Sequence, residues 1–433
     1  MVVEFSVKNF RSIKELQTIS FSKTGLKSSE KNQEVDINNI ALDGGMELFK
    51  TIGVYGANAS GKSNIIKALD FFIRTITREP SSQSNMSELC APFLYQKDAE
   101  NTESFFQITI IIDDVKYRYG LTVMKNNKPK EENDSSYSKE IVTNEWLYGV
   151  KETNMTVLFK RTFDEIENKL SNKDKIPTEL PYEHTLFITH AAAFDNEGAC
   201  KIIRNYLGGM TTSNFNFSHD KFRWMSIQYL ENTKDPQKKI DFLKLLSVFN
   251  LNYSDVTLEK DNDSDKNDIF PQEKINLIKE YKDENNDVIN IQLNLRNNES
   301  AGTQKLFDLS GLLLRAFNLP KPAFIILDEI DSNFHPSLLI KLVGLFNDPV
   351  INKSKSQLLF TSHDTNLMSP TIMRRDQFYF TEKNEDDSTR LYSLADLKGI
   401  RNDADFAKQY LAGYYGALPI LKDYKLKKAT HNE

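Results

Sequence analysis

The sequence predicts an α/β fold in which helices flank a mixed sheet that carries a nucleotide site. Three observations predict this class: a phosphate-binding loop between an apolar run and a helical pattern, a second apolar run that ends in two carboxylates, and a third that ends beside a histidine. Together they describe strands whose ends bring charged groups to one edge of a sheet.

Composition limits the classes of protein that the chain could represent. Its 433 residues are long for a single core, so one large composite domain or two to three smaller ones are expected. The 55 basic and 61 acidic residues give a net charge of −6, so no overall positive field indicates nucleic-acid binding. Local basic patches remain compatible with this balance, and DNA binding therefore stays open.

Cysteine content and hydropathy predict the compartment. The cysteines are Cys90 and Cys200, and residues 1–11 lack the charged and then apolar pattern of a signal peptide. No uninterrupted apolar run approaches the roughly 18 residues of a membrane span. We therefore expect a soluble cytoplasmic protein that does not contact membranes.

The phosphate-binding loop fits the pattern G-x-x-x-x-G-K-[ST] at every required position. Its glycines let backbone N–H groups point inward toward phosphate oxygens at the start of a helix, where the dipole also favours anions. Lys62 should reach the β- and γ-phosphates of ATP, and Ser63 should bind Mg²⁺. The alternative is a chance glycine-rich turn. The residues expected around the phosphates are Gly56, Ala57, Asn58, Ala59, Ser60, Gly61, Lys62, Ser63 and Asn64.

Elements around the loop follow from residue periodicity. Residues 2–10 alternate as a half-buried strand, a second strand is expected at 18–22, and the polar stretch 23–39 is expected to be a loop. After the helix at 64–77, residues 105–123 are expected to form a hairpin that turns at Asp113-Asp114.

The middle of the chain changes pattern. Residues 163–255 carry apolar side chains at helical spacing, whereas 125–139 and the acidic run 259–268 are expected to be surface loops. Strands return at 274–281 and 288–295. The predicted domains are the N-terminal half of the nucleotide fold (1–160), a mainly helical insertion (161–270) and the C-terminal half (271–433).

The second half of the chain supplies acid–base chemistry. The apolar run 323–327 ends in Asp328 and Glu329, where Asp328 should hold Mg²⁺ and Glu329 should orient or deprotonate the attacking water. The strand at 357–361 is followed by His363, which we predict to be a catalytic residue that hydrogen-bonds the γ-phosphate. The carboxylate pair alone occurs often by chance, and His363 alone would be a structural histidine, but their order after the phosphate loop favours catalysis.

A second helix N-terminus precedes the carboxylate strand. Ser300 and Gly302 open a helical pattern that stops before Pro320, and such a terminus can bind an anion. The alternative is an ordinary N-cap. Because one nucleotide does not need two helix N-termini of the same chain at its γ-phosphate, we expect the second to serve a neighbouring copy.

The order of these motifs resembles the ABC-type ATPase heads of the group that includes structural-maintenance, RecF and OLD proteins, and differs from ring-forming motors. Within that group the chain is most similar to the stand-alone phage-defence ATPases, the RloA/AbiL-like and PARIS AriA-like proteins. The resemblance covers about residues 1–125 and 285–420. The stretches that carry it are 5–13, 328–336, 374–380 and 410–419.

The resemblance implies a head-to-head homodimer, possibly a higher oligomer, that encloses ATP and Mg²⁺ between copies. It also implies that Arg11 contacts the nucleotide and that Gln96 contacts Mg²⁺ and the attacking water, although Gln96 could equally be an exposed loop residue. The segment Ser300-Ala-Gly-Thr303 departs from the Leu-Ser-Gly-Gly of transporters, which leaves open how tightly a dimer closes.

The resemblance further implies an ATP-hydrolysing switch of a bacterial anti-phage system that responds to a phage component and controls a separately encoded effector, a nuclease. About 40 residues follow Leu391, too few for the Toprim nuclease of OLD relatives, so the chain should not cut nucleic acid itself. Two alternatives remain: a RecF-like DNA-repair ATPase, and a nucleotide-gated scaffold with little turnover. A transporter subunit fits less well, because the helical insertion has no place in one.

Overall fold

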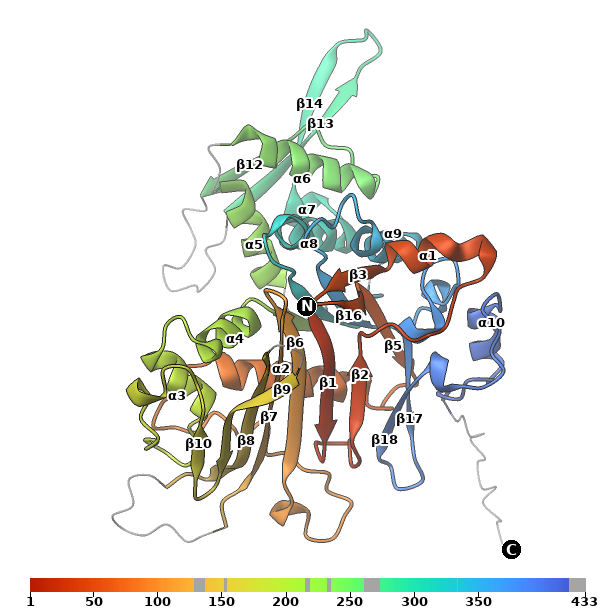
Figure 1. Ribbon diagram of the computed structural model, residues 1–433. Coiled ribbons are helices and arrows are strands. Elements are labelled where there is room, and N and C mark those ends of the chain that lie inside the picture. Colours follow the sequence, from red (N-terminus) through yellow and green to blue (C-terminus); the bar gives the residue numbers. More distant parts are fainter. Residues whose placement is uncertain are drawn as a thin grey trace, which may run out of the picture.

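The computed structural model describes residues 1–127, 137–151, 154–214, 219–231, 235–260, 273–332 and 334–419. Two sheets dominate it, one antiparallel and one mainly parallel, with helices between and outside them (Figure 1). This arrangement confirms the predicted α/β class.

The antiparallel sheet has the strand order β10-β9-β8-β7-β6-β1-β2. The hairpin expected at 105–123 is confirmed, and its turn residues Asp113 and Asp114 have φ values of 50° and 63°. Three strands of this sheet were not predicted from the sequence. Polar residues such as Asn144 and Glu145 interrupt the apolar pattern in the region of β8 and β9, and β10 lies at the start of the stretch 163–255 that was expected to be helical. The strands are β1 (Val2–Lys8), β2 (Gln17–Ser20), β6 (Ser104–Ile112), β7 (Val115–Lys125), β8 (Glu140–Lys151), β9 (Asn154–Thr162) and β10 (Ile166–Asn168).

The second sheet has the order β11-β15-β16-β5-β17-β18. Strand β5 runs parallel to both of its neighbours, β16 and β17, so the phosphate loop that follows it leaves the middle of the sheet. Every residue of β5, β15 and β16 is buried, as continuous apolar runs predict. The strands are β5 (Thr51–Gly56), β11 (Thr211–Asn214), β15 (Phe324–Asp328), β16 (Gln357–Thr361), β17 (Phe378–Lys383) and β18 (Thr389–Ser393).

Helices divide into two groups on opposite faces of this second sheet. Helix α2 (Lys62–Thr77) shares one core with the antiparallel sheet and with α3 (Phe187–Phe194) and α4 (Ala199–Gly208). The other core contains α5 (His219–Glu231), α6 (Pro236–Val248), α8 (Ala301–Asn318), α9 (Pro336–Asn347) and α10 (Phe406–Leu411). None of the helices in the described ranges is long and apolar enough to cross a membrane.

Shorter elements complete the description. A small helix, α1 (Gln33–Asn38), forms inside the stretch 23–39 that was expected to be a loop throughout, and Val35 of this helix is buried. The hairpin of β3 (Ile40–Asp43) and β4 (Met46–Phe49) follows, and α7 (Leu295–Asn298) precedes α8. The 3-10 turns are η1 (Glu30–Asn32), η2 (Ala99–Asn101), η3 (Lys173–Lys175), η4 (Thr365–Leu367), η5 (Arg375–Gln377) and η6 (Leu394–Asp396).

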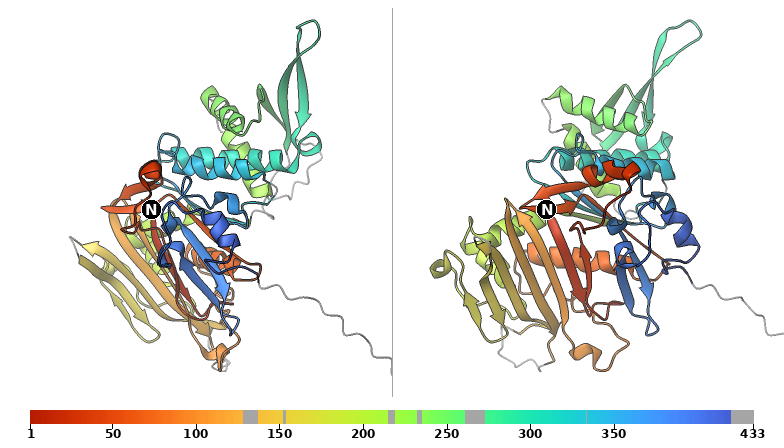
Figure 2. Two further views of the ribbon diagram at one scale, coloured as in Figure 1. Left: turned by 90° about the vertical axis from the view of Figure 1, so that its right-hand side faces the viewer. Right: turned by 45° about the vertical axis from the view of Figure 1, so that its right-hand side comes forward.

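The assignment of residues 161–270 to a separate, mainly helical insertion domain remains a prediction. Within it, α3 and α4 pack into the core of α2, and β11 joins the main sheet beside β15. Most of the acidic run 259–268 and most of the loop 125–139 lie outside the described residues. A separate sheet contains β12 (Asp255–Lys260), β13 (Glu273–Lys282) and β14 (Val288–Asn294). Its β13–β14 hairpin projects from the body (Figures 1 and 2).

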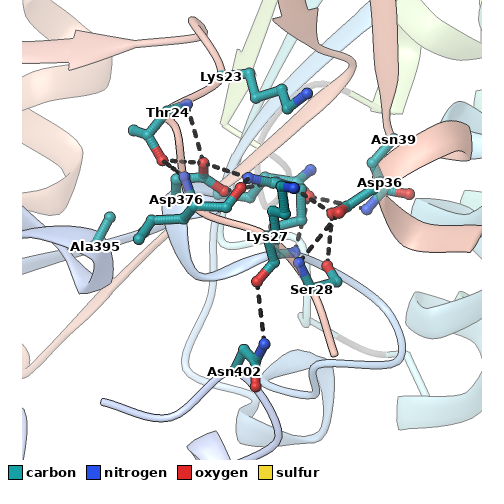
Figure 3. Close-up of polar contacts among 12 residues, drawn as sticks. Lys23, Thr24, Lys27, Ser28, Asp36, Asn39, Asp376, Ala395 and Asn402 are labelled. Atoms are coloured by element: carbon teal, nitrogen blue, oxygen red, sulfur yellow. Dashed lines mark hydrogen bonds and ion pairs between the residues drawn. The ribbon is translucent and has the colours of Figure 1, made fainter. Parts of the chain in front are cut away.

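A buried ion cluster fixes the N-terminal stretch 23–36 to the strand beside β5. The Arg374 guanidinium, 3% exposed, donates to both carboxylate oxygens of Asp376 at 2.9 Å and also contacts Asp36. The Thr24 hydroxyl donates to Asp376 at 2.6 Å and the Ser28 hydroxyl to Asp36 at 2.6 Å (Figure 3). Because Asp376 lies two residues before β17, this cluster also positions the strand that neighbours β5.

Candidate functional site

The phosphate loop occupies the connection from β5 to α2. Gly56 and Gly61 have φ values of 146° and 111°, which residues with a Cβ atom rarely adopt. A Cβ atom on Gly56 would overlap the carbonyl oxygen of Thr381, and one on Gly61 would overlap the side chain of Thr389. Only glycine fits these two positions, as the sequence pattern predicted.

Hydroxyl groups hold the outside of the loop. The Ser60 and Thr381 hydroxyls lie 2.5 Å apart, and the Thr389 hydroxyl donates to the carbonyl of Ser60 at 3.0 Å. The hydroxyls of Thr389 and Ser12 are 2.7 Å apart, and the amide of Asn64 donates to Ser12 at 2.7 Å. The loop is therefore fixed by β17, β18 and the N-terminal segment.

Lys62 points back into the loop. Its ammonium donates to the carbonyls of Gly56 at 2.8 Å and Ala57 at 3.0 Å. Burial lowers the pKa of Lys62, and the negative charges of Asp328, Glu329 and Asp331 act in the opposite direction. The amine therefore lies within the curve of the loop.

The two carboxylates end β15, which is separated from β5 by β16 alone. Thr361, the last residue of β16, links them: its hydroxyl donates to Asp328 at 2.5 Å and accepts from the backbone N–H of Glu329 at 2.8 Å. Glu329 has a φ of 55°, so the chain turns sharply as the strand ends. Asp328 is 2% exposed, and Glu329 is half-buried.

His363 completes the cluster from the end of β16. Its backbone N–H lies 3.3 Å from both carboxylate oxygens of Asp331. Partial burial lowers the pKa of His363, the positive charge of Lys62 lowers it further, and the nearby carboxylates oppose this. The structure thus places Lys62, Asp328, Glu329 and His363 at the carboxyl ends of three adjacent parallel strands.

Ser300 caps α8, because its hydroxyl accepts from the backbone N–H of Thr303 at 3.2 Å. Ser300 is exposed, and Gly302 lies half-buried in the first turn. Lys305 in the next turn donates to the carbonyl of Ser332 at 2.9 Å, so the start of α8 adjoins the turn that follows Glu329.

Two predicted residues lie in other surroundings. The Arg11 guanidinium stacks over the rings of Phe10 and Phe71 at 5.5 and 5.2 Å. Phe71 stands nine residues into α2, about 13 Å along the helix axis from Lys62. Gln96 donates to Asn9 at 2.7 Å and to Thr102 at 3.2 Å. Their contacts with the nucleotide and with Mg²⁺ remain predictions.

Sequence reasoning missed three contributors. Asp331 stands two residues after Glu329 and binds the His363 backbone, and its place beside the carboxylate pair was the available signal. Thr361 gave no such signal, and Ala417 lies in the stretch 410–419, which carried the family resemblance but no predicted role at the loop. The Ala417 carbonyl accepts from the backbone N–H of Ala57 at 2.9 Å, so residues near the described C-terminal limit contact the phosphate loop.

Two of the three predicted metal ligands, Ser63 and Asp328, are chemically suited to Mg²⁺, whereas Gln96 contacts Asn9 and Thr102. Ser63 and Asp328 offer hydroxyl and carboxylate oxygens, the ligand types that Mg²⁺ prefers. Within the described ranges no three histidine, cysteine or acidic residues form a cage for a metal. Mg²⁺ commonly keeps water and phosphate ligands, so two protein ligands suffice.

Comparison with known proteins identifies the family. The family model described as "AAA domain, putative AbiEii toxin, Type IV TA system" matches residues 52–369, which include Lys62 and His363. Since the match spans more than half of the chain, the chain belongs to this family of P-loop ATPase domains. A search of curated proteins finds no match. Among solved structures, one described as the recombination mediator protein RecF with ATPγS in the RecFOR pathway is 14% identical, covers 90% of this chain and 98% of its own, and has a TM-score of 0.32.

Proposed function

Because the chain belongs to this family of P-loop ATPase domains, we propose that it is an ATP-binding and ATP-hydrolysing switch of a bacterial anti-phage system. It dimerises head to head around ATP and Mg²⁺ and controls a separately encoded effector, a nuclease. The observation that carries the proposal is the placement of Lys62, Glu329 and His363 at the carboxyl ends of β5, β15 and β16, which are adjacent parallel strands.

The chemistry follows from the residues at that edge. The loop N–H groups and the start of α2 bind the phosphates, and the Lys62 ammonium exchanges its two carbonyl partners for phosphate oxygens. Mg²⁺, held by Ser63 and Asp328, would neutralise charge on the phosphates. Glu329 accepts the proton of the attacking water, and neutral His363 donates a hydrogen bond to the γ-phosphate.

The second copy is proposed to complete the site. Ser300 and Gly302 open an exposed helix N-terminus, which would cover the γ-phosphate bound by Lys62 of the neighbouring copy. Each copy would then contribute one phosphate loop and one α8 terminus, as in an isologous dimer.

The defence role is supported by the family description, which names a putative AbiEii toxin of a type IV toxin–antitoxin system. Hydrolysis of ATP by itself changes nothing lasting in a cell, so another molecule must respond to the nucleotide state. ATP can favour one state of that complex only through a difference in affinity.

The test has two parts. The purified chain should hydrolyse ATP only with Mg²⁺, and the chain expressed from its native operon should co-purify with a neighbouring gene product that mass spectrometry identifies. Turnover that rises only with duplex DNA, without such a partner, would favour the repair alternative. Absence of turnover with intact ATP binding would favour the scaffold alternative.

A further inference from the structure

Strand β14 is the outer strand of the projecting three-stranded sheet, β12-β13-β14 (Figures 1 and 2). In the described part of the chain no strand pairs with its outer edge. Its sequence, Val-Ile-Asn-Ile-Gln-Leu-Asn, contains neither a charged residue nor a proline. Proteins usually protect exposed edges with such residues, so an unprotected edge indicates a strand that pairs with another chain.

One face of this hairpin carries apolar side chains from the core to the tip. Tyr281 lies opposite Ile289, and Leu277 lies opposite Leu293, so these side chains share a face, which also carries the exposed Lys279 opposite Ile291. Leu277 at the base is fully buried, whereas Ile291, Ile289 and Tyr281 are 43%, 45% and 51% exposed. The core thus continues outward into an apolar face that solvent contacts.

We propose that β14 pairs antiparallel with β14 of a second copy, across a two-fold axis at Ile291. In this register Ile289 of one copy lies opposite Leu293 of the other, so the apolar faces of the two hairpins join. A shift of one residue would place apolar side chains opposite polar ones and on different faces. The alternation of apolar residues in β14 therefore favours registers in which odd-numbered residues of one copy lie opposite odd-numbered residues of the other.

Charge supports the same register. The turn of the hairpin carries Asp283, Glu284 and Asp287, and the exposed Arg296 lies in α7, two residues after the end of β14. Antiparallel pairing about Ile291 places the acidic turn of one copy beside Arg296 of the other. Because β14 itself is uncharged, the paired strands meet no repulsion between like charges.

Pairing of seven residues buries less than the roughly 1,000 Å² that a stable interface needs by itself. The strand contact therefore acts with the nucleotide-dependent interface, and in this respect the inference rests on the proposed function. Only five residues separate Asn294 at the end of β14 from Ser300, so the hairpin connects to the helix terminus that is proposed to meet the neighbouring nucleotide.

Disulfide cross-linking of the full-length chain tests the register. The native Cys90 and Cys200 are 6% and 2% exposed, which leaves an introduced cysteine as the reactive one. Under copper phenanthroline oxidation, Ile291→Cys should link two copies, because directly opposite Cβ atoms lie about 4.5–5.5 Å apart and can relax into disulfide geometry. Asn290→Cys is the matched control: its two copies would be diagonal neighbours, about 7–8 Å apart. We expect at least tenfold less linking for this control.

Lysine substitutions test the contact between the two β14 strands without cross-linking. Ile289→Lys combined with Ile291→Lys should weaken self-association at least tenfold in sedimentation velocity with ATP, while Asn290→Lys changes it by less than threefold. Binding of a fluorescent ATP analogue should stay unchanged in both charge variants, which separates this inference from the proposed ATP site. Equal linking of the two cysteine variants, or an Ile291→Cys chain that dimerises with ATP yet stays unlinked or links to a different protein, overturns the inference.

Discussion

The N-termini of α2 and α8 were both predicted to be anion sites, and the structure builds them differently. Helix α2 begins at Gly61, which provides no side-chain cap, so the first N–H groups of the helix face the phosphate loop. Helix α8 begins at Ser300, whose hydroxyl already accepts from Thr303. One terminus is open beside Lys62, Asp328 and Glu329, and the other is capped and exposed.

This difference teaches how one chain can offer two parts of a shared site. An open terminus with a lysine inside it has free donors for a full set of phosphate oxygens. A capped terminus keeps fewer free donors, which suits a contact made with a single γ-phosphate after another surface has bound the rest. The comparison predicts that substitutions at the N-terminus of α2 abolish ATP binding. Substitutions at the N-terminus of α8 should abolish only ATP hydrolysis, the step that needs two copies.

Lys62→Ala should have the largest effect, because it removes the cation that reaches the β- and γ-phosphates. We expect ATP affinity to fall at least 100-fold in isothermal titration calorimetry. Lys67→Ala, on the exposed side of the same helix, is the matched control and should bind normally. Wild-type affinity in Lys62→Ala would show that α2 is not the phosphate site.

Glu329→Gln should separate binding from turnover at the same site. The amide cannot accept the proton of water, so hydrolysis should fall by about 10²- to 10⁴-fold while ATP affinity is kept. If closure is driven by ATP, this variant should accumulate as a dimer in sedimentation. Glu385→Gln, at an exposed turn, should hydrolyse ATP normally. Undiminished turnover in Glu329→Gln would require a different base.

Ser300→Arg tests whether the capped terminus acts on another copy. Its bulk should block hydrolysis by colliding with the γ-phosphate held by the neighbour, while ATP binding by the isolated chain is spared. Ser300→Ala is the control for loss of the cap alone, which costs about 0.5–2 kcal/mol. Mixing Ser300→Arg with Lys62→Ala should restore one of two composite sites. Full activity of Ser300→Arg by itself would exclude catalysis across a dimer.

The sequence predicted the open terminus well because a single local pattern contains it. The strand, both glycines and Lys62 lie within twelve residues, and their roles depend on backbone geometry that glycine alone permits. The continuous apolar runs of β15 and β16 were equally clear, since strands buried on both faces do not alternate.

The rest depended on contacts between distant residues. Thr361 joins Asp328 and Glu329 from a strand 33 residues away, and Ala417 reaches Ala57 across most of the chain. Such partners carry no sequence signal, because a threonine or a carbonyl fits many environments. Strands β8 and β9 were missed for a related reason. Glu145 in β8 is buried, and its carboxylate accepts hydrogen bonds from the N–H groups of Phe187 and Ile188. Residue periodicity cannot predict a buried carboxylate of this kind.

Gly311→Ala should perturb the placement of α8 without touching its N-terminus. A Cβ atom at this position would overlap the backbone of Ser226 in α5, so we expect a loss of about 1–3 kcal/mol of unfolding free energy. Gly344→Ala in α9 meets no atom within 4 Å and should instead stabilise by up to about 1 kcal/mol. Chemical denaturation measures both. Equal effects would mean that α5 and α8 do not cross closely.

The prediction with the smallest expected effect concerns the protonation of His363, which lies near the open N-terminus of α2. The pKa of His363 is lowered by partial burial and then by Lys62, so the folded chain favours the neutral imidazole. The stability that this preference contributes is present above about pH 6.5 and falls as pH drops through the lowered pKa.

Bound ATP brings negative charge beside this imidazole and should raise its pKa again, so protons and ATP bind cooperatively. ATP affinity should therefore rise a few-fold as the pH drops from 7.5 to 5.5, and His363→Gln should lose the part of this rise that the imidazole causes. ATP itself gains a proton over the same pH range. Because the wild type and His363→Gln bind the same nucleotide, the difference between their profiles of ATP affinity against pH isolates the contribution of His363. Parallel profiles would place the histidine too far from the γ-phosphate to bind it, and would leave Lys62 and the loop N–H groups as the phosphate ligands of this terminus.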